Sequence, residues 1–149
     1  MELLKETRQG LLDTLADTTR HVDILSPDLE PPLLDDDSVI SALTQLVRRG
    51  SRSRIRLIVA QLDAKIVGSH RLVLLAKRLT SAIELRVLDD HPEWPNATWV
   101  ICDQVAGVVV STPKRQSRPI TGRAEARVMT DQFERLWQSA ELSPEMRQF

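Results

Sequence analysis

The sequence offers five polar side chains that could bind a ligand or move a proton, all expected in loops or at a helix start: Asp28, Glu30, Gln61, His70 and Arg71. Carboxylates, an imidazole and a guanidinium in one crevice would bind a cationic or mixed-charge small molecule, or a metal ion. His70, oriented by Asp28, would also have the parts of a general base for hydrolysis. The alternative is a set of solvated loop charges, with His70 capping a helix or bonded to Asp28.

The spacing of metal-binding residue types does not favour a metal in this crevice. Neither H-x-x-x-H nor C-x-x-C occurs in the sequence. The single cysteine, Cys102, excludes an internal disulfide, and its place in an apolar segment favours a small packed residue over a nucleophile. We therefore expect no metal and no cofactor.

A second chemical group consists of cations near the end of the sequence: Lys114, Arg115, Arg118, Arg123 and Arg127. Arg115, Arg118 and Arg123, together with Arg71, are candidates for contacting phosphate in an anion or a nucleic acid. The alternative is a solvated basic loop. A denser cluster over residues 48–56 falls between a predicted helix and a predicted strand, so we expect it at the opposite edge from the crevice.

The composition argues against nucleic acid as the default partner. The net charge is −1, and the chain has no Tyr, 2 Phe and 3 Trp, which leaves few rings to stack on bases. With 149 residues, 42% hydrophobic and 28% charged, the sequence predicts one globular domain over 1–149. No uncharged segment approaches the roughly 20 residues that span a bilayer. We expect a cytoplasmic protein without membrane contact.

Apolar periodicity predicts an α/β fold with a mixed parallel and antiparallel sheet flanked by helices. The predicted order begins with a helix at 2–18, a strand at 22–25, a helix at 38–47, a strand at 55–60, a helix at 67–79 and a strand at 83–87. The nearly continuous apolar run at 55–60 is typical of a strand covered on both faces. Pro31 and Pro32 predict a long connection without helix before the second helix.

The pattern changes after the third strand. Apolar runs at 99–102 and 105–110 are separated by two residues, which predicts an antiparallel hairpin. Residues 112–123 predict a basic loop, 126–128 a short strand, and the segment with Phe133 and Trp137 a final helix whose aromatic face is core. The crevice is expected at the carboxyl ends of the parallel strands.

This order, αβαβαβ followed by a hairpin and a helix, resembles the phospholipase D-like fold. The signature of that family, H-x-K-x4-D followed by Gly-Ser, aligns with Asn96-Ala97-Thr98 through Asp103, and with Val110-Ser111. Asp103 and Ser111 match. Asn96 stands at the histidine position, Thr98 at the lysine position and Val110 at the glycine position. Asp103 also has a simpler interpretation, as the turn residue of the hairpin.

The resemblance implies a domain that has lost catalysis. In the family the histidine attacks a phosphodiester and the lysine holds the phosphate, and neither Asn96 nor Thr98 replaces these functions. Family members with one motif pair through their site edge, which implies a homodimer. The leading hypothesis is therefore a catalytically inactive interaction or regulatory module. The alternatives are an anion or nucleic-acid binder that uses residues 114–127, and a diverged hydrolase that uses His70.

A closer resemblance is to an uncharacterised bacterial phospholipase D-like domain that often accompanies N-acetyltransferases. It is carried by residues 26–31, Ser-Pro-Asp-Leu-Glu-Pro, and 68–72, Gly-Ser-His-Arg-Leu. This resemblance implies an acetyltransferase as a candidate protein partner. The chain itself lacks the Q/R-x-x-G-x-G/A loop that holds acetyl-CoA in acetyltransferases.

Overall fold

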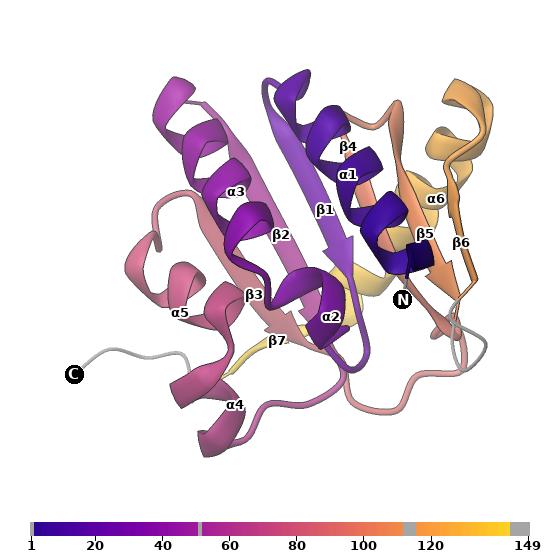
Figure 1. Ribbon diagram of the computed structural model, residues 1–149. Coiled ribbons are helices and arrows are strands. Elements are labelled where there is room, and N and C mark those ends of the chain that lie inside the picture. The colour runs from indigo at the N-terminus through magenta and orange to yellow at the C-terminus, as the bar shows by residue number, and fades with distance from the viewer. Residues whose placement is uncertain (1, 51, 112–115, 144–149) are drawn as a thin grey trace.

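The computed structural model describes residues 2–50, 52–111 and 116–143 as one sheet between two layers of helices (Figure 1). The elements follow in this order: α1 Glu2–Ala16, β1 His21–Leu25, α2 Pro31–Leu34, α3 Asp37–Arg49, β2 Arg54–Val59, α4 Ala64–Ser69, α5 Arg71–Arg78, β3 Ile83–Val87, β4 Ala97–Cys102, β5 Ala106–Ser111, β6 Gln116–Pro119, α6 Gly122–Ser139 and β7 Glu141–Leu142. The predicted α/β class is confirmed.

The sheet is mixed, as the sequence predicted. Its strand order is β6-β5-β4-β1-β2-β3-β7. The strands β1, β2 and β3 run parallel, whereas β4 lies antiparallel beside β1 and begins the hairpin with β5. The parallel strands give the sheet two distinct ends, which we name the carboxyl edge, where β1 to β3 finish, and the amino edge, where they begin.

Helices α1, α3 and α5 cover one face of the sheet and α6 covers the other (Figure 1). Alternate residues of a strand therefore enter different cores: Ile24 packs on the side of α1 and α3, and Leu25 packs on the side of α6. Phe133 and Trp137 are buried in the α6 core, as predicted.

The connection after β1 contains a helix that the sequence analysis excluded. Pro31 and Pro32 are the first two residues of α2, where a helix needs no internal N–H donor, so proline starts the helix there instead of breaking it. Leu33 and Leu34 of α2 are buried. The next helix, α3, is capped by Asp36, whose Oδ2 accepts from the backbone N of Val39 at 3.1 Å.

The predicted third helix is two helices. His70 has an extended backbone, with φ −74° and ψ 122°, and it ends α4 and begins α5. The apolar periodicity of the sequence did not reveal this break, because Val67 and Leu72, on either side of it, are both buried in the core.

Two predictions near the end of the sequence were wrong. Residues 116–119 of the predicted basic loop form β6 beside β5, while 112–115 lie outside the described residues. The predicted strand at 126–128 belongs to α6, in which Ala126, Met129 and Phe133 are buried at helical spacing while Val128 is 68% exposed. The short edge strand β7 was not predicted.

Two linked ion pairs, one of which includes the buried Asp23, join α6 to the sheet. Asp23 of β1 and Arg56 of β2 stand opposite each other, with Oδ1 to Nε at 2.9 Å, and Arg56 Nη1 lies 2.7 Å from Glu134 Oε2 of α6. Its guanidinium also lies over the Phe133 ring, 5.0 Å from the centroid. Arg56, which the sequence grouped with the basic cluster over residues 48–56, is therefore paired inside the fold, with Asp23 and Glu134.

Within the described ranges, the chain has no helix of the length and apolar character that a bilayer crossing requires.

Candidate functional site

The residues predicted to share one crevice are divided between two places at the carboxyl edge. Gln61 follows β2 and lines a pocket beside β3, whereas Asp28, Glu30, His70 and Arg71 surround the α2 segment and the joint between α4 and α5. The sequence placed these residues at the correct edge, and the structure separates them along it.

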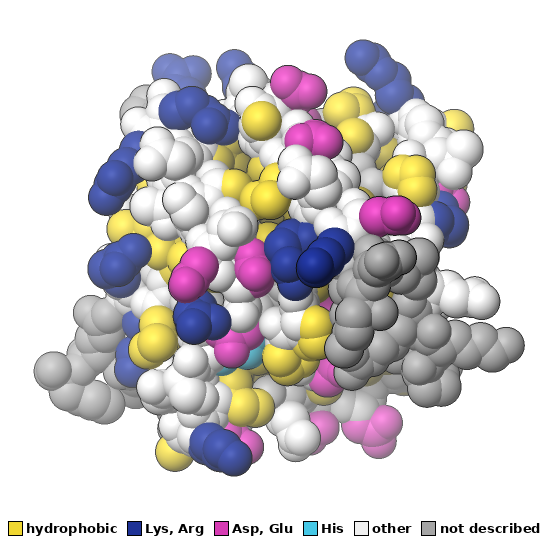
Figure 2. Space-filling model, in the orientation of Figure 1, with side chains coloured by type: hydrophobic (Ala, Val, Ile, Leu, Met, Phe, Trp, Pro, Cys, Tyr) yellow, Lys and Arg dark blue, Asp and Glu magenta, His cyan; other side chains and the backbone are white. Residues whose placement is uncertain are grey.

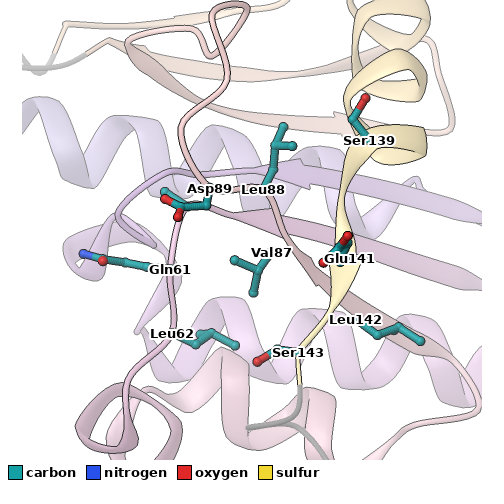
Figure 3. A pocket seen from close by; sticks show the side chains of 10 residues that line it. Gln61, Leu62, Val87, Leu88, Asp89, Ser139, Glu141, Leu142 and Ser143 are labelled. Atoms are coloured by element: carbon teal, nitrogen blue, oxygen red, sulfur yellow. The ribbon is translucent and has the colours of Figure 1, made fainter.

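The pocket at the ends of β2 and β3 has a volume of ≈ 550 Å³. Asp89 and Gln61 lie on one side of it, Glu141 lies on the other, and Val87 lies between them (Figure 3). Two carboxylates around an apolar floor can receive a polar ligand that carries a positive charge. The Glu141 side was missed because β7 has only two residues, Glu141 and Leu142, too few for a periodic signal.

His70 fastens the α4–α5 joint to the loop after β1. It is 6% exposed, its Nε2 lies 3.1 Å from the carbonyl oxygen of Leu29, and its Nδ1 accepts from the backbone N of Leu72 at 3.2 Å. These partners fix the tautomer with hydrogen on Nε2. Both ring nitrogens are engaged with backbone, so the ring has no nitrogen available to take a proton from a substrate. His70 thus caps the start of α5, which was the alternative to a role in ligand binding.

The other candidates around α2 are also held by local bonds. Asp28 is exposed, and its Oδ1 accepts from the backbone N of Glu30 at 3.1 Å instead of orienting His70. Glu30 is 1% exposed at the start of α2. Arg71 forms ion pairs with Asp35 at 3.5 Å and with Asp37 at 3.0 Å. Its charge is therefore balanced by the start of α3.

The motif positions at the carboxyl edge lie where β1 ends and β4 begins. Thr98 is 0% exposed, and its Oγ1 lies 2.8 Å from Oγ of Ser26, which is also 0% exposed. Asn96 is exposed just before β4. Ser111, at the end of β5, stands opposite Ala97. Thr98, which the sequence analysis aligned with the lysine of the phospholipase D signature, thus makes a buried contact between two hydroxyls.

Asp103 lies at the other end of β4, at the amino edge. Asp103 and Gln104 form the hairpin turn with φ of 52° and 62°. The Asp103 carboxylate accepts from the backbone N atoms of Thr19, Arg20 and His21, each at 2.9 Å. Partial burial acts to raise the pKa of Asp103, but these amide donors outweigh it and hold the pKa below its ordinary value. Asp103 anchors the start of β1.

The anion-binding candidates are not gathered in one exposed loop. Arg118 of β6 forms a bidentate ion pair with Glu125, with Nη1 to Oε1 at 2.8 Å and Nη2 to Oε2 at 3.0 Å. The carboxylate balances the charge of the guanidinium. Arg123 is exposed in the first turn of α6. Arg115 lies outside the described residues.

The remaining reactive residue types do not form a centre in the part of the chain that the structure describes. Burial raises the pKa of the Cys102 thiol to about 12, so the sulfur stays protonated at neutral pH. No group of three or more His, Cys, Asp or Glu side chains among the described residues is placed to hold a metal ion.

Comparison with known proteins gives a family and a fold. The sequence matches the family described as "Domain of unknown function (DUF7931)" over residues 4–149, and no curated protein matches it. NucT from Helicobacter pylori, a member of the phospholipase D family, is similar in structure with a TM-score of 0.65 and 8% identity, over 94% of this chain and 92% of NucT.

TrmBL2, an archaeal chromatin protein whose structure shows a novel mode of DNA binding, is similar with a TM-score of 0.61 and 14% identity. The match covers 94% of this chain and 51% of TrmBL2, so the chain spans about half the length of that protein. At these identities both likenesses concern the fold.

Replacing Asp103 with alanine is expected to lower the free energy of unfolding by about 2 kcal/mol at neutral pH, because hydrogen bonds to a charged group are lost. The folded pKa of Asp103 lies below the ordinary 3.8, so its contribution is present above that value and is lost as the pH falls through the folded pKa. Urea unfolding of both proteins at several pH values should show their difference shrinking in acid. A difference that persists unchanged in acid would contradict this role.

Proposed function

The chain belongs to the DUF7931 family, and we propose that it is a catalytically inactive phospholipase D-like domain that works by binding other molecules. The observation that carries the proposal is the buried contact between Thr98 and Ser26, whose hydroxyl oxygens are 2.8 Å apart. In the proposed alignment, Thr98 takes the place of the lysine in the phospholipase D signature. The likeness of the fold to NucT supports the phospholipase D-like fold on which the proposal is built.

Loss of catalysis follows from the chemistry of the two replaced positions. A phosphodiesterase of this kind needs a nucleophilic imidazole and a cation that stabilises the developing negative charge. Asn96 offers a neutral amide and Thr98 a hydroxyl that faces Ser26 instead of solvent. His70, at the same edge, has both nitrogens bonded to backbone groups.

The proposed module works through protein contacts and as a homodimer, because the family's single-motif halves pair along their site edge. A mass of two chains in solution at micromolar concentration would support this pairing, and a mass of one chain would remove it. An acetyltransferase partner stays a prediction.

The purified chain is expected to hydrolyse no phosphodiester. The measurement is release of nitrophenol from bis(p-nitrophenyl) phosphate, together with cleavage of DNA, RNA and phospholipid, beside the variant His70→Gln. Turnover by the wild type that the variant loses would contradict the proposal in favour of a hydrolase built on His70. Turnover that both proteins share would contradict it through another catalytic group.

A second candidate function is nucleic-acid binding, which the likeness to a DNA-binding chromatin protein and a group of exposed arginines both favour. Phosphate contacts release counterions, so the affinity for a labelled DNA or RNA duplex should fall steeply as salt rises. Fluorescence anisotropy at about 50 mM and about 200 mM salt measures this. An absence of binding at the lower concentration would end this candidate function.

A further inference from the structure

Six exposed arginines meet at the amino edge of the sheet, opposite the motif positions: Arg20, Arg48, Arg49, Arg52, Arg54 and Arg78. We call this surface the basic edge. Three separate connections supply it, namely α1 to β1, α3 to β2 and α5 to β3. Because parallel strands begin at the same edge, the fold gathers cations that the sequence spreads over about sixty positions. In Figure 2, Lys and Arg side chains lie along the upper rim over the end of α3.

Local bonds hold these connections together. Arg20 and Arg54 are joined through their backbones, with Arg54 N donating to the carbonyl oxygen of Arg20 at 2.7 Å. The Arg54 side chain reaches towards β3, where Nη1 lies 3.4 Å from the carbonyl oxygen of Ser81. Arg49 Nη2 donates to the carbonyl oxygen of Thr18 at 3.1 Å. The basic edge is therefore one connected surface.

The positive charge of the basic edge is not balanced within the described part of the chain. None of its six arginines takes part in an ion pair there. Two acids nearby are already engaged, Asp103 by backbone amides and Glu84 by Arg86 at 2.7 Å. Asp13 and Asp17 at the end of α1 are the exposed acidic neighbours. Arg71 and Arg118, by contrast, are each paired with a carboxylate.

Neutral hydrogen-bonding groups adjoin the cations. A hollow of ≈ 400 Å³ at the same edge is lined in part by His21, Arg54, Thr80, Ser81 and Gln104. Hydroxyl, amide and guanidinium donors together suit phosphate and sugar oxygens. Trp137, which also lines the hollow, is buried, so among the described residues that line it His21 supplies the one exposed ring that could stack on an unpaired base.

From this arrangement we infer that the basic edge binds the phosphate backbone of double-stranded nucleic acid without reading its sequence. The inference rests on the second candidate function and names the surface that performs it. Exposed guanidinium groups spread over three connections match a ligand with repeated negative charges. The carboxyl edge carries the opposite charge and would face away from the nucleic acid, with these acids: Asp28, Asp35, Asp37, Asp63, Asp89, Asp90 and Glu141.

The test compares the full chain with the variant Arg48→Ala/Arg52→Ala in binding a labelled duplex by fluorescence anisotropy across a salt series. Removing two phosphate contacts should weaken binding by about tenfold or more at low salt, and should reduce the slope of log K against log salt by about 2. The matched control is Lys5→Ala/Lys65→Ala, which removes two exposed cations elsewhere, in α1 and α4. Its affinity and slope should equal those of the wild type.

The outcomes separate the two claims. Binding that both variants weaken equally, or that neither weakens, would overturn the basic edge while nucleic-acid binding stands. An absence of binding by the wild type would overturn both. Polyglutamate that competes as well as duplex at equal charge concentration would also overturn the inference, because it would indicate an acidic protein as the partner.

Discussion

The antiparallel pairing of β4 with β1 is the contact on which the rest of the molecule depends. It turns a parallel sheet of three strands into a mixed sheet and brings the hairpin against the first strand of the chain. Each end of this seam is closed by a polar contact: Thr98 meets Ser26 at the carboxyl edge, and Asp103 accepts three backbone amides at the amino edge. In the alignment that the sequence suggested, Thr98 and Asp103 are the positions compared with the phospholipase D signature.

The seam gives Asp103 and Thr98 structural roles. The Asp103 carboxylate accepts hydrogen bonds from the backbone N–H groups of residues 19–21, just before and at the start of β1. Thr98 can be small and neutral because Ser26 satisfies its hydroxyl in a site closed to solvent. The described contacts of Asp103 and Thr98 are thus structural ones, with backbone amides and with Ser26.

Parallel strands also separate charge between the two edges. Helices that run against the strands end at the amino edge, where Arg48, Arg49 and Arg78 occupy last turns, and begin at the carboxyl edge, where Asp36 and Asp63 accept from the first helical N–H groups. This arrangement complements the helix dipoles. It also gives a chain of nearly zero net charge one strongly basic end.

The sequence predicted the parts of the fold that have a periodic signal, including the apolar strand β2, the hairpin and the aromatic face of α6. It did not predict α2, because proline was treated as a helix breaker at positions where it starts a helix, or β7, which is too short to have a period. The site was harder. The sequence shows that His70 and Arg118 could bind a ligand, but their partners appear only in the tertiary structure. Backbone groups bond to both nitrogens of His70, and Glu125 balances the charge of Arg118.

The measurement that tests the central claim most directly is the stability of Thr98→Lys, which restores the family's lysine, beside Asn96→Lys two positions earlier. If the position is closed, a lysine at 98 must bury its ammonium against Ser26, and the free energy of unfolding should fall by about 3 kcal/mol or more. The exposed residue 96 should accept lysine within about 0.5 kcal/mol. Equal stability of the two variants would show an open site at Thr98 and would contradict the account.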